Sequence, residues 1–137
     1  MRFMMLMIPK RYGKALPGVM PDAEMVAAMS KYNASLKNAG VLISLEGLHP
    51  PSAGARVIFS KGNPVVARGP FPKVKETLGG YWMINVSSLE EAISWASRCP
   101  AEDNATIEIR RVQEFEEFPA DVQKVGAGFR ELQTTQQ

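Results

Sequence analysis

The chain has 137 residues, enough for one domain with a single hydrophobic core and too few for two ordinary domains. Its formal net charge of only +2 argues against nucleic-acid binding, for which a strongly basic face is expected. No apolar run reaches the ~18 residues needed to cross a membrane, and the single cysteine, Cys99, excludes an intramolecular disulfide. We therefore expect one cytoplasmic domain.

The N-terminal half begins with a short, continuously apolar segment, Phe3 to Ile8. This pattern predicts a strand that is buried on both faces in the middle of a sheet. Residues 9–18 follow as a loop, and Pro21-Asp22 starts a helix that ends before Gly40, which suits the left-handed position after a helix. The apolar face of this helix recurs at helical spacing, and we interpret it as core. It contains Met25, Met29, Tyr32 and Leu36.

Strand-like segments follow at residues 41–45, 81–86 and 106–110. Residues 56–60 and 64–67 are typical of the two arms of a hairpin. A second helix is predicted between the last two strands. It begins with a Ser-x-x-Glu capping box at Ser88 and Glu91, and it ends at Pro100.

The order of elements is strand, helix, strand, hairpin, strand, helix, strand. Without the hairpin this is the split βαβ pattern, so the predicted class is α+β with a ferredoxin-like βαββαβ fold. Two helices cover one face of such a sheet, which leaves apolar side chains of the other face in water. We therefore expect a homodimer that packs sheet against sheet. We assign residues 1–118 to the domain and 119–137 to a C-terminal extension that is partly helical or mobile.

Several motifs are similar to those of one known family. They are Glu46-Gly47-Leu48-His49-Pro50, Gly69-Pro70-Phe71, Lys75-Glu76 and Gly79-Gly80-Tyr81-Trp82. Together they resemble the YCII-related family, also called the DGPF family. The resemblance implies a ferredoxin-like fold whose dimer is of the α/β-barrel type, with a cleft in each subunit. It also implies a candidate chemistry, because a His–Asp pair has been suggested as an acid/base unit in relatives, some of which act on muconate-type or lactone-type products.

The chain departs from the family pattern where this chemistry is expected. Arg68 occupies the sequence position at which the family motif has Asp, and Lys73 occupies another position at which the motif has an acidic residue. A guanidinium cannot orient and stabilise an imidazolium as a carboxylate does, so the relay is absent unless Glu46 or Glu76 replaces it. Cations are in excess from residue 52 to 80. This excess indicates either a pocket for an anion, with Arg68 as a bidentate donor, or a solvated hairpin with scattered surface cations.

His49 is the only histidine, and it follows the strand at residues 41–45. It is either a general acid/base or substrate ligand in a cleft, or a loop histidine that caps backbone carbonyls. One histidine without a carboxylate cluster cannot form a zinc site, and the glycines lack nucleotide-loop spacing, so we expect no metal and no cofactor. The candidate catalytic residue is His49. The candidate ligand-binding residues are Arg68, Glu46, Lys75, Tyr81 and Trp82.

Two hypotheses of function stay open. In the first, the protein binds a small anionic organic molecule in a cleft, with acid/base chemistry of the elimination or lactone type that is weakened by loss of the family Asp. In the second, it is a non-catalytic regulatory or interaction module, in the stress or alternative-sigma-factor context that the resemblance implies. Neither hypothesis involves nucleic acid or a membrane, and whether the protein is an enzyme is left open.

Overall fold

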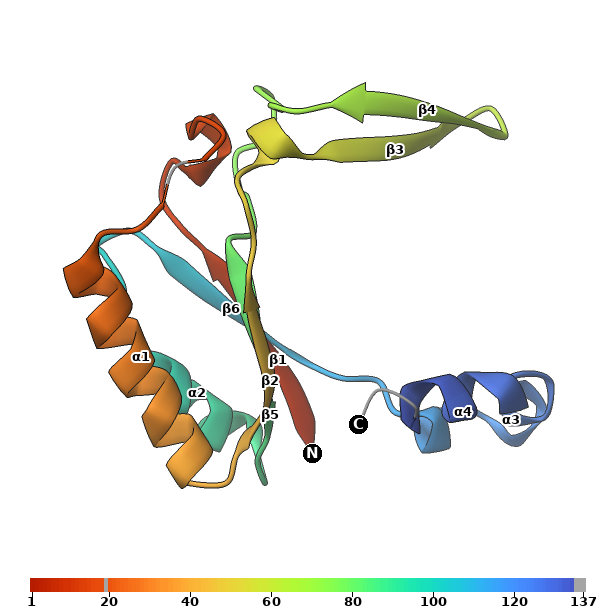
Figure 1. Ribbon diagram of the computed structural model, residues 1–137. Coiled ribbons are helices and arrows are strands. Elements are labelled where there is room, and N and C mark those ends of the chain that lie inside the picture. Colours follow the sequence, from red (N-terminus) through yellow and green to blue (C-terminus); the bar gives the residue numbers. More distant parts are fainter. Residues whose placement is uncertain (19, 135–137) are drawn as a thin grey trace.

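A computed structural model describes residues 1–18 and 20–134 of the chain (Figure 1). The main body is a four-stranded antiparallel sheet in the order β2-β5-β1-β6. Two helices, α1 and α2, lie on one face of this sheet (Figure 1). The bounds of these elements are β1 (Arg2–Ile8), α1 (Ala23–Asn38), β2 (Leu42–Gly47), β5 (Gly80–Asn85), α2 (Leu89–Ser97) and β6 (Thr106–Arg111).

This topology is mixed α+β and compatible with the predicted ferredoxin-like fold. Strands β1 and β2 both pair antiparallel with β5, so they run parallel to each other with β5 between them. That arrangement is the split βαβ unit, and α1 is its crossover helix. The predicted helix and strand segments are confirmed, with shifts of one or two residues at their ends.

The remaining elements lie outside this body. They are the hairpin of β3 (Ala55–Ser60) and β4 (Asn63–Arg68), the short helices η1 (Tyr12–Lys14), η2 (Pro51–Ala53) and η3 (Phe115–Glu117), and the C-terminal helices α3 (Ala120–Val125) and α4 (Ala127–Thr134). The hairpin and the pair α3–α4 project from opposite ends of the sheet (Figure 1). Both project to the side away from α1 and α2, so the molecule has the outline of a letter C.

Both long helices begin at the residues that the sequence indicates. The Asp22 side chain accepts a hydrogen bond from the Met25 backbone N–H (2.8 Å). The Ser88 hydroxyl accepts from the Glu91 N–H (3.1 Å), as the predicted capping box requires. The Glu91 carboxylate completes the cap one residue earlier than predicted, because it accepts from the backbone and side chain of Ser87.

The core fills the space between the helices and the sheet. Tyr32 of α1 meets Trp82 of β5 edge to face, with ring centroids 5.8 Å apart. The indole N–H of Trp82 donates to the side-chain oxygen of Asn33 (2.8 Å), and the Tyr32 hydroxyl donates to the carbonyl of Trp95 in α2 (2.8 Å). These bonds satisfy the polar atoms that the two aromatic rings bring into the core. Fully buried aliphatic side chains complete it, among them Met5, Leu36 and Ile84.

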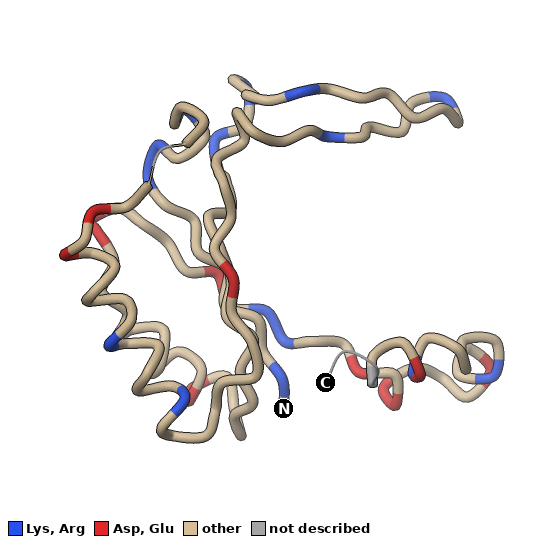
Figure 2. The backbone as a smooth tube through the Cα atoms, in the orientation of Figure 1, with Lys and Arg blue, Asp and Glu red and all other residues tan. Residues whose placement is uncertain are grey.

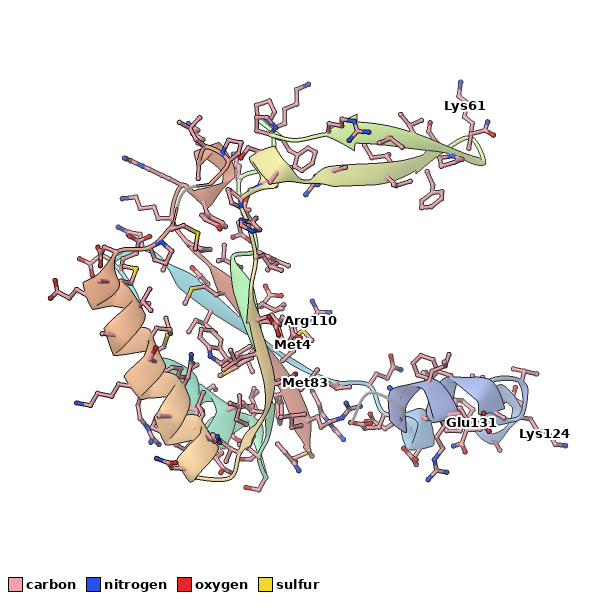
Figure 3. All side chains as sticks on the ribbon, in the orientation of Figure 1. Met4, Lys61, Met83, Arg110, Lys124 and Glu131 are labelled. Atoms are coloured by element: carbon pink, nitrogen blue, oxygen red, sulfur yellow. The ribbon has the colours of Figure 1, made fainter. Side chains whose placement is uncertain are left out.

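The central strand β1 differs in one respect from its prediction. It lies inside the sheet as expected, and Phe3 and Met5 are buried under the helices. Its opposite face is only half-buried, because none of the described elements covers it: Met4 and its β5 neighbour Met83 point away from the helices (Figure 3). We call this side of the sheet the open face.

Candidate functional site

A cavity of about 650 Å³ opens at one end of the sheet. Its walls come from the first turns of α1, from the chain that leaves β1 and β2, and from the loop between α2 and β6. The lining is mainly apolar and contains four methionines: Met7, Met20, Met25 and Met29. The polar side chains in the lining are Lys10, Tyr12, His49 and Glu102. We call this cavity the His49 pocket.

Backbone hydrogen bonds hold one wall of the His49 pocket in place. The Gly79 N–H donates to the carbonyl of Met7 (2.8 Å), and the Leu48 N–H donates to the carbonyl of Gly79 (2.9 Å). Gly79 also packs closely against the next loop, since a Cβ atom at this position would lie 2.6 Å from Cγ of Pro9. This close approach explains why glycine stands here, and it brings the loop after β1 beside the strand exits.

His49 occupies the exit of β2, between this wall and a buried proline. Its ring is exposed and lines the pocket, whereas Pro50 is fully buried. Pro50 therefore anchors the backbone directly behind the imidazole. An exposed imidazole at the mouth of an apolar cavity can exchange a proton with a molecule that enters the cavity.

A second, smaller cavity of about 310 Å³ lies next to the first. The two share Pro9 and Tyr12 in their linings. Three cations line the second cavity: Arg11, Lys14 and Lys75. We call it the cationic pocket.

The structure does not bring the six predicted site residues together. His49 lines one pocket and Lys75 lines the other. Arg68, at the end of β4, is exposed and lines neither of these two cavities. The base of the hairpin nevertheless returns close to the segment after His49, because Gly69 contacts the backbone of Pro51.

The three remaining candidates lie on the sheet. Glu46 and Tyr81 are register partners on the open face, away from both pockets. Trp82 points to the other side, where it is 5% exposed and forms part of the core. Tyr81 and Trp82 therefore face opposite sides of the sheet, as consecutive residues of a strand do.

Sequence reasoning missed Tyr12 and Glu102, and it assigned one pocket residue, Met25, to the core. Met25 is 43% exposed and lines the His49 pocket. Met29 is half-buried; it lines the pocket and also packs against the core, as expected. The interpretation of Tyr32 and Leu36 as core is confirmed. Helical spacing marks one continuous stripe on α1, but the N-terminal end of the stripe, at Met25, lines the pocket, so periodicity alone could not separate core from pocket.

Burial perturbs two titratable side chains near these sites. It raises the pKa of Tyr12, whose hydroxyl donates to the carbonyl of Leu48 and so stays protonated around neutral pH. Burial also raises the pKa of Cys99 to about 11, so this thiol is protonated and a weak nucleophile at neutral pH. In the described part of the chain, no group of three His, Cys, Asp or Glu side chains could hold a metal ion.

The fold and the pockets define a class of protein: a small α+β domain with a hairpin arm and an apolar cavity at the end of its sheet. A family model allows a closer assignment. The model of the YCII-related domain matches residues 1–116, and the chain therefore belongs to that family. None of the described helices has both the length and the apolar character needed to span a membrane.

One curated relative is an uncharacterised protein of Rhizobium meliloti (strain 1021). It is 33% identical to the chain over 75 residues. The aligned segment is 55% of this chain and 60% of the relative, so the match spans less than two thirds of the relative's length.

Proposed function

We propose that this protein binds a small anionic organic molecule with an apolar body, and that it does so in the His49 pocket. One observation carries the proposal: the only histidine lines a mainly apolar cavity of about 650 Å³. Cavities of roughly 300–1,000 Å³ with few polar groups are typical of small-molecule sites. The four methionines give an adaptable wall, because their thioether side chains are flexible and polarisable.

His49 is the acid/base group of any reaction in this pocket. In an elimination or lactone-type reaction it would accept a proton from the ligand and return it at a later step. The family Asp is replaced by Arg68, which lies outside the cavity. Glu102 and Lys10 share the cavity with His49, so Glu102 is the carboxylate of the site that would compensate for the missing Asp.

A second candidate function is a non-catalytic binding module. The replacement of the family Asp by Arg68 favours it, because a guanidinium does not support a His–Asp relay. In this case the pocket still binds a ligand, and the occupied form acts on a partner protein.

The test is binding and turnover of small acids by the full chain and two variants. The probes are phenylacetate and cis,cis-muconate, measured by thermal shift and calorimetry. A probe at 100 times its Kd adds roughly 2.7 kcal/mol of stability, which moves Tm by several degrees. We expect His49→Ala to weaken binding and Arg68→Ala to change Kd less than about twofold. Unchanged binding in His49→Ala would overturn the site. If the native chain turns a probe over and His49→Ala does not, the protein is an enzyme and not a non-catalytic binding module.

We further propose that the protein is a homodimer in which a second copy covers the open face. The apolar residues Met4, Leu6 and Met83 lie there half-exposed, although the sequence of β1 is that of a strand buried on both sides. Burying such side chains stabilises by about 25 cal/mol per Å² of apolar surface. A two-fold contact of this face with itself would supply that burial.

The hairpin β3–β4 and the C-terminal arm, which is formed by α3 and α4, also support a second copy of the chain as the partner of the open face. A two-stranded hairpin is marginally stable alone in water, yet both faces of β3–β4 are exposed, with Phe59 79% accessible on one face and Ile58 50% accessible on the other. Val125 and Leu132 of the C-terminal helices are similarly exposed (87% and 68%). The charged side chains of the hairpin are all cationic, whereas acidic residues predominate among those of the C-terminal arm (Figure 2). A two-fold axis in the plane of this interface, perpendicular to the line that joins the two arms, would place the cationic arm of each subunit beside the acidic arm of the other.

A further inference from the structure

We propose that the cationic pocket is a phosphoryl site, which receives the anionic group of the ligand whose apolar body occupies the His49 pocket. This inference rests on the proposed function and names its substrate class, a small phosphate monoester with an apolar body. Its cations, Arg11 and Lys14 of the loop after β1 and Lys75 of the segment before β5, lie outside the His49 lining.

The charge of the cationic pocket carries the inference. Arg11, Lys14 and Lys75 line it, and no acidic side chain does. Within residues 1–18 and 20–134, no carboxylate forms an ion pair with any of the three. Three uncompensated cations around one cavity favour a ligand group with two negative charges over a single carboxylate. An Arg guanidinium supplies a planar fork for phosphate oxygens, and the two Lys ammonium groups act as point charges.

The pocket is built by two chain segments in close contact. A Cβ atom at Gly13 would lie 2.9 Å from Oγ1 of Thr77, so glycine allows the loop after β1 to approach the segment before β5. Thr77 is half-buried and lines the cavity, and its hydroxyl can donate to an oxyanion. Phe71 closes one side, and its ring is covered by the Arg56 guanidinium at 4.9 Å.

The loop that carries two of the cations is held in one conformation. The Lys14 N–H donates to the carbonyl of Arg11 (3.1 Å), and the carbonyl of Ala15 accepts from the Ser52 hydroxyl (2.8 Å). Arg11 itself has φ 61°, a left-handed backbone that is uncommon for a residue other than glycine. The cations of this loop are therefore presented from an ordered turn.

The adjacency of the two cavities gives the substrate class. Pro9 and Tyr12 line both cavities and form a wall between them. An apolar group beside the methionines would lie on one side of this wall, and an anion beside Lys75 would lie on the other. A compact ligand that extends past the Tyr12 ring can reach both. Phenyl phosphate has this composition and is the probe for the test, with inorganic phosphate and phenol as its two halves.

The experiment is calorimetry of the full chain with the three probes in low-salt chloride buffer, together with Lys75→Ala and Lys73→Ala. Both lysines are exposed, and Lys73 lines neither cavity, so Lys73→Ala is a control with the same change in charge. We expect Lys75→Ala to weaken phenyl phosphate binding by about tenfold or more, because it removes a charge-assisted contact. We expect the Kd of Lys73→Ala for phenyl phosphate to stay within about twofold of the native value. We also expect phenyl phosphate to bind more tightly than inorganic phosphate or phenol.

Equal losses in the two variants, or no loss in either, would overturn the phosphoryl site. The methyl NMR signals of the pocket methionines distinguish this failure from failure of the proposed function. If phenyl phosphate shifts the signals of Met25 and Met29 but its Kd is unchanged in Lys75→Ala, the His49 pocket stands and the phosphoryl site is wrong. If binding depends on Lys75 while the methionine signals stay unmoved, the phosphoryl site stands and the His49 pocket is wrong.

Discussion

The hydroxyl of Tyr12 donates a hydrogen bond to the backbone carbonyl of Leu48, and this contact joins the loop after β1 to the strand exit that carries His49. The two residues are 36 positions apart in sequence. The Tyr12 ring also belongs to both cavities, so one side chain fixes the wall that they share. Removal of its hydroxyl should therefore affect both stability and binding.

Tyr12→Phe is expected to lower the free energy of unfolding by about 1 kcal/mol, the usual net contribution of one hydrogen bond. Because burial raises the pKa of Tyr12, the hydroxyl remains a donor throughout the neutral range, and the loss should be constant between about pH 6 and 9. Urea unfolding at several pH values measures it. A loss that varied steeply within this range would contradict the assignment of the hydroxyl as a protonated donor.

A charge on the open face should prevent self-association. Met83→Glu places a carboxylate at a half-exposed position beside Met4, and burial of an unpaired charge in an interface is strongly unfavourable. Val26→Glu is the control, since Val26 belongs to α1, which covers the opposite face of the sheet, and is 47% exposed. Light scattering with size-exclusion chromatography should give a dimer for the native chain and Val26→Glu and a monomer for Met83→Glu. A native monomer at micromolar concentration would rule out the dimer.

The C-terminal arm should be attached through Arg2 and Glu114. The guanidinium donates to both carboxylate oxygens, from Nε to Oε1 at 2.7 Å and from Nη2 to Oε2 at 2.9 Å. The Arg2 hydrogen bonds lower the pKa of Glu114, so the pair stabilises the fold above the unfolded pKa of about 4.3 and this stability is lost as pH falls through the lower folded value. We expect Glu114→Gln to cost about 1 kcal/mol at pH 7 and almost nothing near pH 2, as measured by urea unfolding.

Glu116→Gln is the matched control for this pair. Glu116 also faces an arginine on the C-terminal arm, but the two side chains are 60% and 63% exposed, so their interaction is screened by water. Glu116→Gln should lower the free energy of unfolding by less than about 0.5 kcal/mol at every pH. If both variants lost the same stability, the special role of the Arg2 pair would be refuted.

The base of the hairpin should tolerate no side chain at Gly69. A Cβ atom there would lie 1.7 Å from the carbonyl oxygen of Pro51, and a backbone atom cannot move aside cheaply. Gly69→Ala is therefore expected to destabilise by about 1–3 kcal/mol, as overpacking does. Gly54→Ala, where the nearest contact is an ordinary 3.6 Å, should change stability by less than about 1 kcal/mol. Thermal unfolding of the two variants provides the comparison.

The fold was predictable because its local signals agree with one another. The caps at Asp22 and Ser88, the turn around Gly62 and the alternation in β6 each mark an element that the structure contains. Strand order follows once these elements form a split βαβ unit. The projection of the two arms was not predictable, because nothing in a local pattern sets the direction of a hairpin relative to a sheet.

The candidate site was predictable only in part. His49 stands out since it is the one histidine and follows a strand. Tyr12 and Glu102 gave no signal, because they belong to loops that meet the His49 segment only after folding. Arg68 drew attention through the family motif, yet its strand ends outside both pockets. Similarity to a motif locates a residue in the sequence, whereas the packing of the loops decides which side chains share a cavity.

The most direct test of the central claim is a methyl NMR titration of the chain labelled at its eight methionines. Met7, Met20, Met25 and Met29 line the His49 pocket, while Met1, Met4, Met5 and Met83 do not, so the protein contains its own control. With phenylacetate or phenyl phosphate, we predict saturable shifts in the first set and small changes in the second. The ring signals of His49, the single histidine, should shift with the first set. Equal shifts in both sets, or none in the first set with any of these acids, would contradict a ligand site at His49.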